Sequence, residues 1–200
     1  MKRIENYDEI KVSEGRGVLP VGGYECVIKN VKHFEHNGIK KVSLEIDIAT
    51  GDYKDYYQEK YDARDEKSKF WDDGATLTFL EEPTEERDKS YFKGLITAIE
   101  SYNPNYKWNW EEDTLKGLKV NCNFSLKEYT GNDGRIYTKP QVGRYVNSKD
   151  NFKKDYVPTV RTINNEFVKY EDYKNKATIE DETLKALGDI VEIDSSNMPF

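Results

Sequence analysis

Cysteine is scarce in this sequence, with two among 200 residues, so buried reduced thiols are expected rather than a disulfide. Cys26 and Cys122 both fall on apolar positions of alternating segments, which fits a cytoplasmic protein. No apolar run approaches the length of a membrane span, and none follows the charged residues at the start of the sequence. We therefore expect no contact with a membrane and no signal peptide.

Histidine is equally scarce. His33 and His36 are the only two, and nothing completes the set of about four ligands that a structural zinc site needs. No Ser-His-Asp arrangement has a recognisable spacing, and no phosphate-cradling glycine loop is present. Asp47 and Asp52 would suit a magnesium ion in a nuclease, but nothing around them demands one, so a nuclease ranks third among the hypotheses. The sequence predicts no cofactor, no metal site and no enzymatic activity.

Charge is distributed unevenly, although the net charge of −7 by itself argues against a nucleic-acid partner. Between Lys116 and Arg161, ten Lys and Arg stand against four Asp and Glu, whereas residues 177–200 hold six acids and one lysine. The sequence also contains 15 tyrosines, a residue that often serves at interfaces and stacking surfaces. This pattern indicates a basic, tyrosine-bearing surface followed by an acidic tail.

Alternating apolar and polar residues mark the expected strands. Residues 24–31 and 41–48 alternate on either side of Asn37-Gly38, a strong signal for a hairpin turn. Residues 75–80 form the third expected strand. Residues 118–127 and 135–146 alternate on either side of a turn with two glycines, which predicts a second hairpin.

One helix is expected before the second hairpin, because apolar residues recur at helical spacing from Ser90 to Tyr102, just before Asn103-Pro104. The order strand, strand, strand, helix, strand, strand matches an OB-fold, a mainly β domain in which five strands close a small barrel. The alternative is one helix packed on an open five-stranded sheet. The expected parts are an N-terminal arm (1–18), the OB-fold domain (19–146), an irregular extension (147–176) and an acidic tail (177–200).

Two aromatic segments interrupt this scheme. The long excursion after the second strand carries Tyr61, Phe70 and Trp71, which either stack on a ligand or fold back over the core. Trp108 and Trp110 lie between the helix and the fourth strand, and we expect them to plug one end of the barrel.

A single strand of nucleic acid is held by cations that follow the phosphates and by rings that stack on unpaired bases. Both kinds of residue occur on the outer face of the second hairpin and in the long excursion. The candidate site for single-stranded DNA is Lys54, Tyr56, Tyr57, Tyr61, Phe70, Trp71, Lys119, Lys127, Arg135, Tyr137, Lys139, Arg144 and Tyr145.

The last residues, an acidic approach followed by Met198-Pro199-Phe200, resemble the C-terminal tip of bacterial single-stranded DNA-binding proteins. The resemblance implies that the terminal residues recruit replication and repair proteins, with Phe200 entering a pocket of the partner. Ser195, Ser196 and Asn197 depart from the family, which has more aspartates there, and the flexible linker of that family is absent. The implied partner-binding residues are Asp194, Met198, Pro199 and Phe200.

A second resemblance covers residues 19–146. Its motifs are Leu19-Pro20, Gly22-Gly23-Tyr24, Glu45-Ile46-Asp47-Ile48-Ala49, Gly51 with Tyr53-Lys54, Asn103-Pro104 with Tyr106 and Trp108, Leu115-Lys116-Gly117, and Tyr129 with Gly131-Asn132-Asp133-Gly134. These motifs are similar to those of a family of single-strand-binding proteins carried by phages and mobile elements of Gram-positive bacteria. The resemblance implies a role in DNA replication or recombination, and dimers or tetramers. The leading hypothesis is thus sequence-nonspecific binding of single-stranded DNA, and the runner-up is a protein-binding module on an OB scaffold that does not touch DNA.

Overall fold

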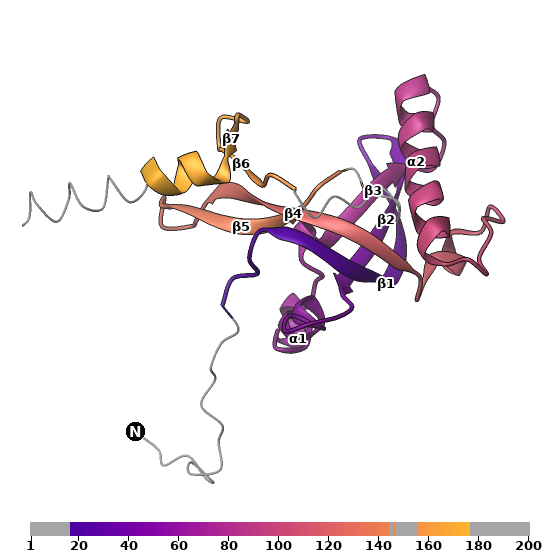
Figure 1. Ribbon diagram of the computed structural model, residues 1–200, viewed down its shortest axis with the longest axis horizontal. Coiled ribbons are helices and arrows are strands. Elements are labelled where there is room, and N and C mark those ends of the chain that lie inside the picture. The colour runs from indigo at the N-terminus through magenta and orange to yellow at the C-terminus, as the bar shows by residue number, and fades with distance from the viewer. Residues whose placement is uncertain (1–16, 145, 147–155, 177–200) are drawn as a thin grey trace, which may run out of the picture.

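The computed structural model describes residues 17–144, 146 and 156–176 (Figure 1). Most of the expected arm, Tyr145 and the expected acidic tail lie outside the described residues. The protein is mainly β, as expected: seven described strands form one mixed sheet in the order β3-β2-β1-β4-β6-β7, with β5 paired to β4. The strands are β1 (Gly22–His36), β2 (Ile39–Ile48), β3 (Thr76–Leu80), β4 (Lys119–Thr130), β5 (Ile136–Val142), β6 (Thr159–Arg161) and β7 (Phe167–Lys169). The helices are α1 (Tyr56–Asp62), α2 (Glu86–Tyr102) and a stretch over 170–176, and the short 3-10 turns are η2 (Glu66–Ser68), η3 (Asp73–Ala75) and η4 (Glu112–Leu115).

Both expected hairpins are present. Asn37 (φ 53°) and Gly38 (φ 74°) both take the left-handed backbone that a two-residue turn between β1 and β2 requires. The turn between β4 and β5 is closed by the amide of Gly131, which donates to the carbonyl of Arg135 at 2.8 Å. The alternating residues of β2 and β4 point into one core, in which Ile46, Ile48 and Phe124 are fully buried.

The helix α2 ends where the sequence predicts, and Asn103 fixes that end to the sheet. Its side-chain amide donates to the carbonyls of Ile99 (2.7 Å) and Lys119 (2.8 Å), and its side-chain oxygen accepts from the amide of Lys119 (3.1 Å). The start of β4 is therefore set by the end of the helix, and Leu95 and Ile99 of α2 pack into the core.

The sheet does not close into a barrel by hydrogen bonding. No ladder joins β3 to β5 among the described residues. Instead η3 leans on β5: the side-chain amide of Gln141 donates to the carbonyl of Asp73 at 3.4 Å, and Gly74 lies so close to Pro140 that a side chain there would collide with its carbonyl oxygen. Only glycine allows this approach of the two backbones.

The long excursion after β2 is folded rather than open. The carboxylate of Asp47, fully buried, accepts from the backbone amides of Ile48 (2.8 Å), Tyr57 (2.9 Å) and Gln58 (3.0 Å). It thereby caps the first turn of α1, which has no cap from its own residues. The carboxylate of Asp47 therefore has a structural role as the cap of α1, although period-two alternation places its side chain on the solvent-facing side of β2.

The expectation of an irregular segment from 147 to 176 is wrong for its described part. β6 pairs with β4 in parallel, and β7 pairs with β6. Each strand has three residues, too few for a periodic pattern, and the parallel partner lies more than 30 residues away in the chain. Of the two tryptophans expected to plug a barrel end, Trp108 packs on the core of the open sheet, and the expectation is wrong for Trp110, which is 78% exposed.

In the part of the chain that the structure covers, no helix is both long and apolar enough to cross a bilayer.

Candidate functional site

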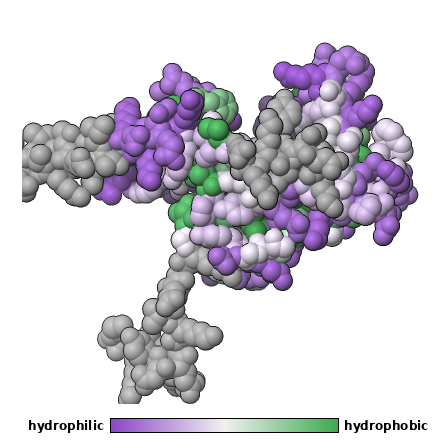
Figure 2. Space-filling model, in the orientation of Figure 1, coloured by the Kyte–Doolittle hydropathy of each residue, from purple (hydrophilic) through white to green (hydrophobic). Residues whose placement is uncertain are grey.

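An open groove with a volume of about 850 Å³ lies between β3 and the β4–β7 part of the sheet. One wall comes from β1, β2 and β3, with Phe34, Ser43 and Thr78. The other comes from β4, β5, β6 and β7. Figure 2 shows hydrophobic patches around β6 and β7 on a face that is otherwise largely hydrophilic. The second wall contributes Lys127, Gln141, Tyr156, Thr159, Arg161 and Phe167.

Strand register places a row of cations on this second wall. Lys139 of β5 lies opposite Lys127 of β4, Lys127 lies beside Arg161 of β6, and Arg161 lies opposite Phe167 of β7. Directly paired residues point to the same face of a sheet. Three cations and one ring thus cross four neighbouring strands, about 4.8 Å apart, on one face.

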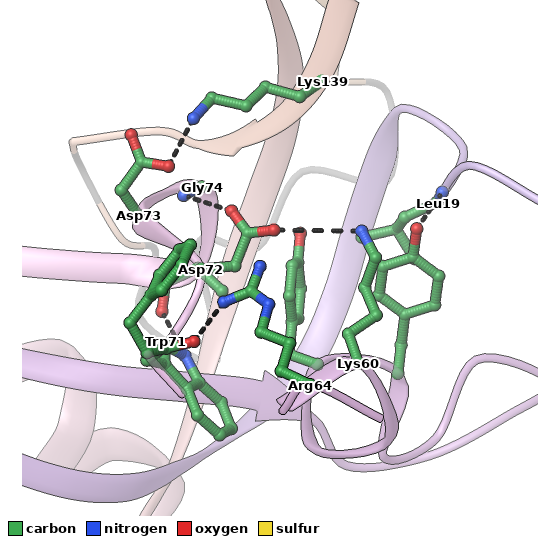
Figure 3. Close-up of polar contacts among 12 residues, drawn as sticks. Leu19, Lys60, Arg64, Trp71, Asp72, Asp73, Gly74 and Lys139 are labelled. Carbon is green, nitrogen blue, oxygen red and sulfur yellow. Dashed lines mark hydrogen bonds and ion pairs between the residues drawn. The ribbon is translucent and has the colours of Figure 1, made fainter. Parts of the chain in front are cut away.

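The row is only partly neutralised. The ammonium of Lys139 contacts the carboxylate of Asp73 in η3 (Figure 3). Partial burial of Asp73 works against its ionisation, but the hydrogen bond and charge of Lys139, with the charge of Lys127, outweigh it and lower the pKa of Asp73. Arg161 donates to the side-chain oxygen of Asn165 at 2.9 Å, which leaves its charge in place. No ion pair to Lys127 is present among the described residues, so the centre of the row is positive.

Exposed rings accompany the cations. Phe34 is 42% and Phe167 is 71% exposed, and both line the groove from opposite walls. On the face of the cation row, Tyr129 and Tyr137 lie opposite each other with ring centroids 5.8 Å apart. The ammonium of Lys139 lies 5.7 Å from the Tyr129 ring centre. These rings are accessible for stacking.

At the α2 end of the groove, Arg144 is held in place by two partners. Its guanidinium lies 4.7 Å from the ring centre of Tyr91, and one of its nitrogens lies 3.3 Å from a carboxylate oxygen of Asp88. Arg144 therefore joins the chain after β5 to α2 and also lines the groove.

The structure brings together part of the candidate site. Lys127 and Arg144 line the groove, and Lys139 and Tyr137 share the face of the cation row. Arg135 lies in the β4–β5 turn, with its guanidinium 3.8 Å from Asp133. Tyr145, also expected at this site, lies outside the described residues.

The excursion contributes Asp73 to this groove, but none of its candidate residues line it. The expectation was wrong for Tyr56 and Tyr57, which are buried at 3% and 2% exposure, because α1 turns both rings into the core. Tyr61 packs against Trp71, whose indole N–H donates to the carbonyl of Ala75 at 3.2 Å (Figure 3). The alternative in which the rings fold back over the core therefore holds for Trp71, which packs against the core, and not for Phe70, which is 59% exposed. Of the other candidates outside the groove, Lys54 lies 3.8 Å from Asp55, Lys119 lies 2.9 Å from Glu25, and Phe70 lies under the guanidinium of Arg64.

Sequence reasoning missed Phe34, Arg161 and Phe167. Phe34 has a usable signal, because it is an apolar residue on the polar positions of β1, opposite Lys41. Arg161 and Phe167 flank a short loop that contains Asn164-Asn165, a turn signal between two very short alternating segments. No signal in the sequence pairs those segments with β4.

No protein-family model matches this chain, and no curated protein matches it either.

Proposed function

We propose that the protein binds single-stranded DNA without sequence preference along the groove between β3 and the β4–β7 wall. The observation that carries this proposal is the register-matched row of Lys139, Lys127 and Arg161 ending at the exposed ring of Phe167. Cations at regular spacing hold phosphates, and rings beside them stack on bases of any identity. Each stacked base contributes about 1–3 kcal/mol.

The finer fold belongs to the same proposal. We propose that β1–β5 with α2 are an OB-fold whose barrel is left open between β3 and β5. The order β3-β2-β1-β4-β5 and the single helix between β3 and β4 support it. OB-folds bind oligonucleotides on the face of strands 2 and 3 and through the loops of the two hairpins. The groove adjoins that face, since Ser43 of β2 and Thr78 of β3 line it.

The biological setting rests on the resemblances in the sequence. The proposal is a role in DNA replication or recombination of a phage or mobile element, inside a bacterial host cell, in a dimer or tetramer. The segment with Asp194, Met198, Pro199 and Phe200 is proposed to recruit replication or repair proteins, and all four residues lie outside the described ones.

The test is fluorescence anisotropy with single-stranded and duplex oligonucleotides over a range of salt. We expect strong preference for the single strand and a log K that falls with log salt by about 0.7 per neutralised phosphate. Replacing both Lys127 and Arg161 by alanine should weaken binding and reduce that slope by about 1.4 if each holds one phosphate. Lys116→Ala is the control, since Lys116 lies outside the groove and pairs with Asp113 on the surface, at 3.2 Å.

Equal affinity for duplex, or no binding in low salt, would rule the proposal out. The runner-up, a protein-binding module without DNA contact, would then remain. A second groove beside α2, lined by Phe79, Phe92, Trp108 and Trp110, is the observation that favours it.

A further inference from the structure

A second, smaller groove with a volume of about 660 Å³ lies beside α2, away from the cation row. It is bounded by the end of β3, by α2 and by the connection from α2 to β4, which projects beside the helix (Figure 1). Its rings form a continuous series: Phe79 lies 5.1 Å from Phe92, Phe92 lies 5.7 Å from Trp108, and Trp108 lies 6.1 Å from Trp110. The inner rings belong to the core, whereas the outermost, Trp110, is exposed.

Trp110 is held out on an ordered turn. Its φ of 69° is a left-handed backbone, which a bulky residue keeps only where the surrounding structure holds it. The turn around it is fixed by hydrogen bonds: Glu100 accepts from the amide of Trp108 at 2.9 Å, and Thr114 bonds to Tyr106 at 2.8 Å and to the carbonyl of Glu111 at 2.6 Å. Exposure of this ring is therefore built into the fold.

The surroundings of this groove are acidic. Its lining carries three acids, Glu81, Glu100 and Glu112, against two basic residues, Lys89 and Lys93. More acids occur in the connection before α2 and in the turn after Trp110. A phosphate backbone would be repelled from such a rim, so the rings here do not suit nucleic acid. These further acids are Glu82, Glu85, Glu86, Glu111 and Asp113, of which Glu86 pairs with Lys89 at 2.9 Å and Asp113 with Lys116 at 3.2 Å.

We propose that this groove docks a segment of another protein that carries Lys or Arg beside aliphatic residues. A cation stacks on the exposed face of Trp110, where cation–π attraction is strongest among the aromatic side chains, and the acidic rim attracts the same charge. An aliphatic side chain fills the space lined by Phe79, Phe92 and Trp108. The acidic segment 177–200 of this chain has the wrong sign of charge for the rim.

The experiment uses the full chain and three pools of fluorescein-labelled 12-residue peptides, containing Lys/Arg with Leu/Ile, Asp/Glu with Leu/Ile, or Ser/Gln with Leu/Ile. We expect binders in the basic pool only, with affinity lowered about tenfold or more by Trp110→Ala. Affinity should also fall with added salt and in a Glu81→Lys, Glu112→Lys double variant. Phe70→Ala is the matched control, because it removes a ring of 59% exposure that lies outside the groove.

Several outcomes would overturn the proposal: no basic peptide that discriminates Trp110→Ala from the native chain, tighter binding by the acidic pool, or a dimer in sedimentation that Trp110→Ala dissociates. The melting temperature of each variant shows whether it is folded. Trp110→Ala should not lower it, because the side chain of Trp110 is exposed. The proposal is independent of the DNA groove. Trp110→Ala should leave affinity for single-stranded DNA unchanged, and a loss there would assign these rings to nucleic acid instead.

Discussion

Tyr56 and Tyr57, neighbours in α1, differ in the hydrogen bonding of their hydroxyl groups. Both rings are buried in the core, and they pack edge to face with centroids 5.0 Å apart. The hydroxyl of Tyr56 accepts a hydrogen bond from the buried amide of Leu19 at 3.1 Å (Figure 3). The hydroxyl of Tyr57 is buried with no partner among the described residues. Comparing variants of Tyr56 and Tyr57 therefore separates the stability that a buried ring contributes from the stability that its hydroxyl group contributes.

We predict that Tyr56→Phe lowers the free energy of unfolding by about 1–3 kcal/mol, because it leaves the amide of Leu19 buried and unpaired. Tyr57→Phe should leave that free energy unchanged or raise it, since it removes a polar atom that gains no hydrogen bond. Equilibrium urea unfolding of the two variants measures both values, and each serves as the other's control. Equal losses in the two variants would contradict the hydrogen-bond assignment.

For single residues, the sequence predicts which face of a strand a side chain lies on better than it predicts whether that side chain is exposed. Period-two alternation places Val42, Leu44 and Cys122 inside, and all three are buried. The same rule predicts exposed side chains at Glu45 and Asp47, which are nevertheless buried. Glu45 is covered because Asn30 donates to it at 3.1 Å and Lys32 pairs with it, and Asp47 because α1 folds over it. Such contacts depend on residues distant in the sequence, which alternation does not report.

Among the elements, the contact between η3 and β5 decides how the open side of the sheet is held. It rests on Gly74 against Pro140 and on the pair between Asp73 and Lys139. Lys139 is also part of the cation row, so this ion pair competes with any phosphate that the row binds.

We predict that Asp73→Asn lowers stability at neutral pH, and that the difference from the native chain disappears in acid. The pKa of Asp73 is lowered in the folded state, so its charged form contributes stability above the unfolded value of about 3.9. That contribution is lost as pH falls through the lowered folded pKa. Urea unfolding at several pH values between 7 and 2.5 measures it.

The control is Asp113→Asn, which removes a carboxylate from a surface pair with Lys116. If the difference in the free energy of unfolding between the native chain and Asp73→Asn stays constant down to the lowest pH, the packing of η3, and not the charge of Asp73, is responsible.

Long periodic elements were predictable, and short or distant pairings were not. The helix α2, the hairpins and β2 follow from hydrophobic periodicity and turn residues. The pairing of β6 with β4 depends on three-residue strands, and it supplies Arg161 and Phe167 to the groove. Two of the three cations of the row, Lys127 and Lys139, were thus predictable from the sequence, and its continuation onto β6 and β7 required the structure.

For the whole molecule, the net charge of −7 conceals a segregation of charge. The groove of β4–β7 is basic, the aromatic groove beside α2 has an acidic rim, and residues 177–200 carry six acids against one lysine. Surfaces of opposite sign on one small protein can select different partners, because each repels what the other attracts. This separation is the physical basis for proposing DNA on one groove and a basic protein segment on the other.

The end of the acidic segment 177–200 can be tested by deletion. Deleting residues 194–200 removes Asp194 together with Met198, Pro199 and Phe200. We predict an unchanged melting temperature and an affinity for single-stranded DNA that is equal or slightly higher, because less negative charge then competes for the cation row. Co-purification with replication or repair proteins should be lost, since a buried phenylalanine contributes about 1.5–3 kcal/mol to a contact. Asp189→Asn, which keeps the terminal residues, is the matched control. A truncated chain that unfolds or loses DNA affinity would show that these residues support the fold or the groove, and the resemblance to a partner-binding tip would then have no functional meaning.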